Sequence, residues 1–117
     1  MASQLHNSMG AITISDRVVA EIACSAAMET YGIVGLAARN PKDGLYELLR
    51  LENMTKGVMI ASHSDSSIAI SLSVIIESGV RIAVVAENII EKIRYQVETR
   101  TGLRVRDVQV IVQGIRV

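Results

Sequence analysis

The sequence predicts an α/β (α+β) domain: a two-layer sandwich in β-α-β-β-α-β order, with two helices packed on one face of a small mixed sheet. Large apolar and mostly small side chains alternate over residues 67–76, which is typical of a strand with one buried face. Apolar residues recur at helical spacing in two other stretches, residues 18–27 and 82–97. The chain has 117 residues, half of them apolar, which fits one globular domain.

The N-terminal part divides at residue 10. Residues 1–9 show no hydrophobic period and are predicted to form a flexible arm, so the domain is expected over residues 10–117. Ala11–Ile14 alternates and predicts a short strand. Ser15 then stands where the N-cap of a helix over residues 16–31 belongs, because its hydroxyl can accept a backbone N–H of the first turn.

The middle of the chain gives the weakest pattern. Residues 33–56 are the least periodic stretch, with turn chemistry over 40–44. Residues 46–51 are predicted to form one or two helical turns. Residues 57–61 read as a strand that forms a hairpin with the alternating segment after a short polar loop.

The C-terminal part predicts a helix followed by a strand. The helix runs from about residue 82 to about residue 100 and stops at Gly102. The last strand covers residues 105–113. Two amphipathic helices can cover one face of the resulting sheet, so the other face should be open to solvent or to a partner.

The open face is the candidate partner-binding surface. Its side chains are small or apolar and nearly uncharged, so a partner would lose little by desolvating them. A weakly polar, solvated surface is the alternative, because single apolar residues are common at protein surfaces. The residues expected at this surface are Met59, Ser71, Ser73, Ile75 and Ile111.

Nucleic-acid binding is disfavoured by charge and composition. Twelve basic residues balance twelve acidic ones, and the chain has no Phe or Trp to stack bases. One short motif argues the other way: Gly32-Ile33-Val34-Gly35 matches the G-x-x-G loop with which KH domains clamp a nucleic-acid backbone. A helix-ending glycine followed by a chain reversal explains the same residues. A KH-like module that uses the Gly32–Gly35 loop is therefore kept as the alternative function.

No catalytic, cofactor or metal constellation is found in the sequence. Cys24 reads as a small buried residue, and neither His6 nor His63 has a sequence reason to lie near it. The spacing of these three residues is not that of metal ligands. We therefore predict a protein that is not an enzyme and needs no cofactor.

Location is inferred from what the sequence lacks. The longest apolar runs are about five residues, far short of the roughly 20 that span a bilayer, so direct membrane insertion is not expected. The first residues do not form a secretion signal. A single cysteine fits a reducing cytoplasm.

The ordered set of segments over residues 10–117 resembles the alkaline-shock-protein family. The first half contributes Gly10-Ala-Ile-Thr-Ile-Ser15 and Tyr31-Gly-Ile-Val-Gly-Leu36; the second contributes Ser71-Leu-Ser-Val-Ile-Ile-Glu77, Val85-Ala-Glu-Asn88 and Val108-Gln-Val-Ile-Val-Gln-Gly114. The resemblance implies a cytoplasmic, non-enzymatic scaffold of Gram-positive bacteria that acts in the envelope stress response. It also implies self-association into a homo-oligomer and peripheral membrane attachment through a separate anchoring protein. A further alternative is an accessory role beside a dihydroxyacetone-kinase-like enzyme of lipid metabolism.

Overall fold

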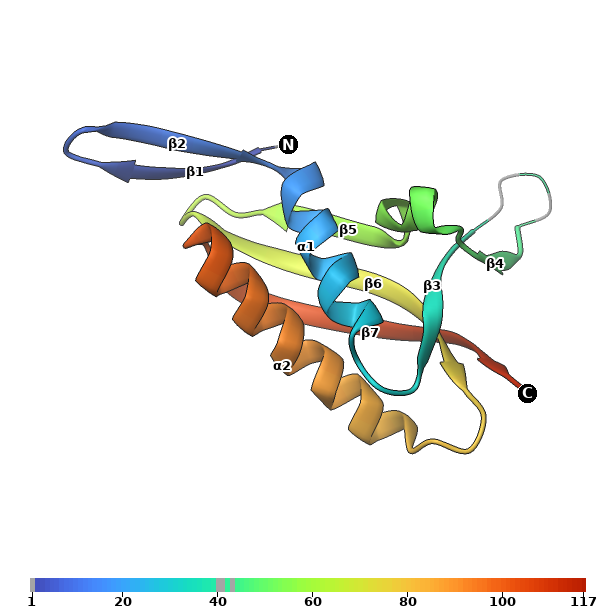
Figure 1. Ribbon diagram of the computed structural model, residues 1–117. Helices are drawn as coiled ribbons and strands as arrows, with labels where there is room; N and C mark the ends of the chain where they lie inside the picture. Colours follow the sequence, from blue (N-terminus) through green and yellow to red (C-terminus); the bar gives the residue numbers. More distant parts are fainter. Residues whose placement is uncertain (1, 40–41, 43) are drawn as a thin grey trace.

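The fold is a two-layer α+β sandwich, seen in a computed structural model that describes residues 2–39, 42 and 44–117. Figure 1 shows the helices α1 (Asp16–Met28) and α2 (Ile82–Thr101) side by side on one face of a mixed sheet. That sheet has the order β4 (Tyr46–Leu48), β3 (Ile33–Arg39), β6 (Ser67–Glu77), β5 (Val58–Ser62), with β7 (Arg104–Arg116) on the other edge of β6. The predicted fold class is confirmed.

The central strand β6 organises the sheet. It pairs antiparallel with β5 and β3, which lie one after the other along one of its edges, and parallel with β7 along the other edge. Its alternate side chains point into the layer between sheet and helices and are almost fully buried, as period two requires. These core side chains are Ile68, Ile70, Leu72, Val74 and Ile76.

Both predicted helices are confirmed, with small changes at their ends. Ser15 caps α1, its hydroxyl accepting the backbone N–H of Val18 at 3.3 Å. The helix ends at Met28, before the predicted residue 31. α2 ends at Thr101 and is capped by Gly102, whose left-handed backbone (φ 78°) lets its N–H reach the carbonyl of Glu98. The alanines of α1 bring its backbone close to the sheet and to α2.

The N-terminal segment corrects two expectations. Residues 2–7 form strand β1 (Ala2–Asn7), which pairs antiparallel with β2 (Gly10–Ser15), so the expectation of an arm without regular structure is wrong for these residues. The predicted strand at residues 11–14 exists, but it lies in this separate hairpin and not in the main sheet. Figure 1 shows the hairpin projecting from the body beyond α1. Its pairing is with a neighbour in sequence, which a search for hydrophobic period does not detect.

The middle of the chain also differs from the prediction. Residues 46–48 are strand β4, not a helical turn, and the helical turn comes later as the 3-10 helix η1 (Leu51–Gly57). The sequence does not predict strand β3, because Gly35, Leu36 and Ala37 are all buried and the residues of this strand do not alternate between apolar and polar. Leu36 faces the core, while the 3-10 segment and β4 cover the neighbouring positions. Residues 40, 41 and 43 of the predicted turn lie outside the described residues.

The close approach of the 3-10 segment to β3 can be tested at Gly57. An added Cβ there would lie 2.9 Å from the backbone oxygen of Ala37, which cannot swing aside. We expect Gly57→Ala to lower the free energy of unfolding by about 1–3 kcal/mol, the usual cost of overpacking. Gly114→Ala is the matched control, since nothing lies within 4 Å of its added Cβ. Urea denaturation of both variants measures the difference; equal midpoints would contradict the packing described here.

Candidate partner-binding face

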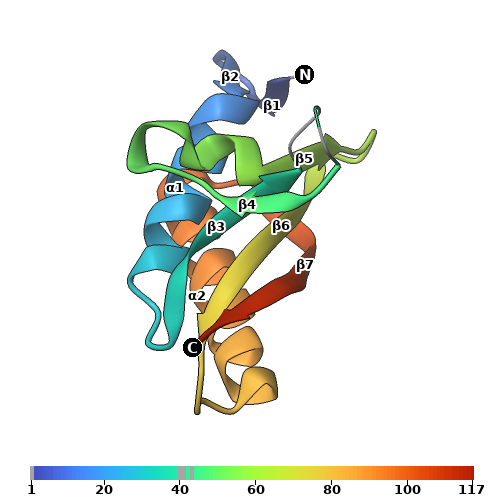
Figure 2. The ribbon, with the colours of Figure 1, turned by 90° about the vertical axis from the view of Figure 1, so that its right-hand side faces the viewer.

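The side of the main sheet opposite the helices carries the five predicted residues, and the structure brings them together. Figure 2 shows both helices on one side of the sheet and its other side without a helix. Met59 of β5 is registered beside Ser71 of β6, and Ser73 of β6 beside Ile111 of β7. Ile75 continues the row along β6, next to Gly35. We call this surface the open face.

Exposure differs across the open face. Met59 is 73% exposed and is the most prominent apolar side chain there, while Ile111 is 37% exposed. Ser71, Ser73 and Ile75 are half-buried because their neighbours on β3, β5 and β7 stand beside them. These three residues alternate with the buried residues of β6 and therefore point to the side of the sheet away from the helices.

Two adjoining shallow hollows mark the open face. One, of about 270 Å³, is lined by Met59, Ile60, Ala61, Ala69, Ile70, Ser71, Asp107 and Gln109. The second, of about 170 Å³, lies toward β3 and β4. Met59 and Ser71 line both hollows, so these two side chains lie where the hollows adjoin. The middle of the face is apolar or hydroxylic, and charges stand at its margins: Asp107, Arg39 and Lys56.

Sequence reasoning missed one part of this surface. Tyr46 of β4 is 46% exposed and lines the second hollow together with Ala37 of β3. Both residues come from strands that the sequence did not predict. The sequence between Arg39 and Tyr46 is typical of a turn, but it does not predict that Tyr46 pairs with Arg39 of β3.

The Gly32–Gly35 segment has a structural explanation of its own. It runs from the end of the α1–β3 connection into the first residues of β3 and does not join two helices, and both glycines are buried. An added Cβ would lie 2.9 Å from Val85 Cγ2 at Gly32 and 2.8 Å from Leu48 Cδ1 at Gly35. Gly32 also has φ 94°, which favours glycine. Close packing therefore accounts for both glycines without a bound nucleic acid.

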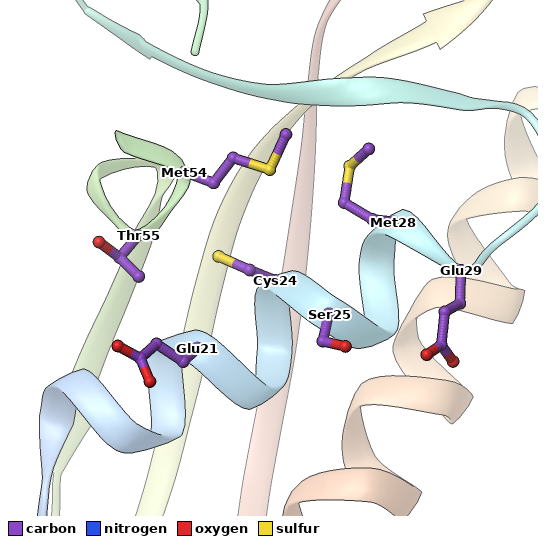
Figure 3. Close-up of a pocket in the computed structure, with 7 residues that line it drawn as sticks. All are labelled: Glu21, Cys24, Ser25, Met28, Glu29, Met54 and Thr55. Carbon is purple, nitrogen blue, oxygen red and sulfur yellow. The ribbon is translucent and has the colours of Figure 1, made fainter. Parts of the chain in front are cut away.

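Cys24 lies apart from His6 and His63. Cys24 lines a hollow of about 410 Å³ between α1 and the 3-10 helix, which Met28 and Met54 also line (Figure 3). His6 and His63 share a different, polar hollow between the N-terminal hairpin and the β5–β6 loop. Within residues 2–39, 42 and 44–117, no group of three or more His, Cys, Asp or Glu side chains could hold a metal ion.

The β5–β6 loop is fixed by hydrogen bonds. Asp65 accepts from the backbone N–H of Ser67 at 3.1 Å and from its hydroxyl at 2.5 Å, and its other oxygen pairs with Arg104 at 3.0 Å. The Ser67 bonds, more than the arginines nearby, lower the pKa of the Asp65 carboxyl. These contacts tie the start of β6 to the start of β7.

Comparison with known proteins gives the class to which this chain belongs. The model of the alkaline shock protein 23 family, which is described by a "cell envelope-related function", matches residues 4–117. The protein YloU of Bacillus subtilis (strain 168) is 42% identical over all of this chain and 98% of its own length. Spy1614 of Streptococcus pyogenes serotype M6 is 36% identical over all of this chain and 97% of its own. Both are named as uncharacterized proteins.

The chain belongs to the alkaline-shock-protein family, which confirms the resemblance found in the sequence. Two solved structures of the MamM CTD are also similar, at 13% identity and a TM-score of 0.49, over 83% of this chain and 94% or 92% of theirs. In the part of the chain that the structure describes, no helix is both long and apolar enough to cross a membrane.

The state of Cys24 gives a prediction for its reactivity. Burial, and secondarily the nearby charge of Glu21, raises the pKa of the Cys24 thiol from 9.0 to about 11. At pH 8 the folded protein should therefore hold roughly a hundredfold less thiolate than the unfolded chain, because each pKa unit is a factor of ten. Iodoacetamide labelling followed by mass spectrometry, with and without urea, checks this. Equally fast labelling of both states would contradict a buried, protonated thiol.

Proposed function

We propose that this protein is a non-enzymatic interaction protein that acts as a self-associating scaffold in the envelope stress response or envelope homeostasis. Its family has a cell envelope-related function, which sets the cellular context. The open face carries the proposal: Met59 stands exposed at its centre, over small side chains, with charges only at the margins. An apolar centre within a polar rim is the usual arrangement of a protein–protein interface.

Energetics favour contact at this face. Fully burying a methionine side chain is worth about 1.5–3 kcal/mol, and the two hollows beside Met59 offer room for side chains of a partner. The serine hydroxyls on the floor cost little to desolvate when they keep a hydrogen bond, whereas buried charges would cost much more. Docking at the open face therefore gains apolar burial without stranding a charge.

Two further observations support a binding role over catalysis. The only cysteine faces a hollow different from the one that holds His6 and His63. Its raised pKa keeps the thiol protonated at neutral pH, which makes it a poor nucleophile. In our proposal the protein is cytoplasmic and reaches the membrane periphery through a separate anchoring protein that contacts the open face.

Self-association is tested by sedimentation velocity over a concentration series. We expect the sedimentation coefficient to rise with concentration, because a scaffold built from one chain must bind further copies. A single monomeric species at every concentration would contradict the scaffold.

The role of the open face is tested in the native cell with Met59→Glu. This change puts a charge at the apolar centre of the face, and we expect the protein to leave the membrane fraction when cells are fractionated. Tyr95→Glu is the matched control, since Tyr95 is 66% exposed on α2, away from the open face. Protein-free lipid vesicles should bind neither the unaltered chain nor the variants. Retention of Met59→Glu at the membrane, or binding to bare vesicles, would contradict attachment through a partner at this face.

A further inference from the structure

The longest exposed edge of the molecule is strand β7. It has 13 residues and, among the described residues, pairs only with β6. Proteins usually protect such an edge by keeping the strand short or covering it, because its unpaired N–H and C=O groups can pair with another chain. The opposite edge of the sheet follows this rule, since it is formed by two short strands, β4 with three residues and β5 with five.

Only the beginning of β7 is protected. Arg94 of α2 donates to the carbonyl of Val105 at 2.9 Å, and Glu98 of α2 accepts from the N–H of Val105 at 3.0 Å. Because these backbone groups bond to α2 side chains, they point away from β6, toward the free edge. In the described part of the chain no comparable contact occurs farther along, so the edge from Asp107 onward is open.

The charges on this open stretch are placed symmetrically. On β6, Ser73 lies midway between Ala69 and Glu77. Asp107 of β7 is registered beside Ala69, Ile111 beside Ser73, and Arg116 beside Glu77. The bulges of β7 keep all three on the open face. Asp107 and Arg116 therefore stand at equal distances from Ile111 and carry opposite charges.

We propose that β7 pairs antiparallel with β7 of a second copy of this chain, around a two-fold axis at Ile111. Positions equally far from such an axis face each other, so Asp107 meets Arg116 of the second copy, and Arg116 meets Asp107. Opposite charges directly across two strands stabilise the pair. This inference rests on the proposed self-association and names the surface through which it occurs.

The remaining contacts fit the same register. Ile111 meets its own counterpart at the axis, and Ile115, half-exposed in one copy, comes opposite Val108. Neither Asp107 nor Arg116 has an ion-pair partner within the described chain, although Glu77 is registered beside Arg116. In the pair of chains, the guanidinium of Arg116 would lie between Glu77 of its own chain and Asp107 of the second copy.

The pairing has a structural consequence for the open face. A two-fold axis perpendicular to a sheet keeps both copies the same way up, so the two sheets join into one continuous sheet. Both pairs of helices then lie on one side and both open faces on the other. The dimer presents the two Met59 side chains on a single surface, which a partner could bind at two points.

Charge reversal tests the register. In the Asp107→Arg variant, the introduced arginine of each copy faces Arg116 of the other copy. In the Arg116→Asp variant, the introduced aspartate of each copy faces Asp107 of the other copy. We expect each variant to weaken the dimer at least about tenfold in its dissociation constant by sedimentation. Glu91→Arg on the exposed side of α2 is the matched control and should leave the dimer unchanged. Unchanged dimers in both charge-reversal variants would overturn the proposal.

Mixing the two variants provides a rescue that does not depend on stability. In a mixed pair, the arginine introduced at position 107 of one chain faces the aspartate introduced at position 116 of the other. The original Arg116 and Asp107 face each other at the second position. We expect an equimolar mixture of Asp107→Arg and Arg116→Asp to recover the dimer, as should the variant that carries both changes. A mixture that stays monomeric would overturn the register.

The outcomes separate this inference from the proposed function. If the unaltered chain is a monomer at every concentration, the scaffold and the edge pairing both fail. If it self-associates but ignores charge reversal at Asp107 and Arg116, only the edge pairing fails. If charge reversal dissociates the dimer while Met59→Glu does not, the edge joins the copies and the open face is left for the partner.

Discussion

The alternation along β6 is the constraint on which the rest of the structure depends. Its core-facing residues, from Ile68 to Ile76, are fully or almost fully buried, and both of its edges are paired along much of their length. Because side chains of a strand point alternately to opposite faces, burying one set presents the other set outward. That second set is small: Ala69, Ser71 and Ser73, with Ile75 at the end. One strand thus creates the core and the open face together.

The two helices complete the core and leave the open face as it is. α1 and α2 pack against each other and against the same side of the sheet, so neither is available for the other side. At one end of the open face β4 and the 3-10 segment contribute Tyr46 and Gly57, which border a hollow. The molecule therefore offers a broad surface for contact, while Cys24 and the two histidines lie in separate places.

An edge and a face serve different purposes in this arrangement. An edge strand binds through backbone hydrogen bonds, which any extended chain can form, so its specificity comes from the side chains at matching positions. A face binds through shape and apolar burial, which depend on the particular side chains exposed. Joining copies by the edge would extend the face without using it. A small protein could in this way become a larger platform for an envelope function.

The sequence by itself determined the elements with a clear period: α1, α2, the β5–β6 hairpin and β7. It also placed Met59, Ser71, Ser73, Ile75 and Ile111 on one face, because the direction of a side chain follows from its position in a strand. Tertiary structure alone decided that residues 2–7 pair with β2, and that β3 joins the sheet through β6. In β3 the covering segments bury Gly35, Leu36 and Ala37 together, so no alternation remains to be read. Tertiary structure also brings Tyr46 to the open face, because the pairing of β4 with β3, and no local period, places it there.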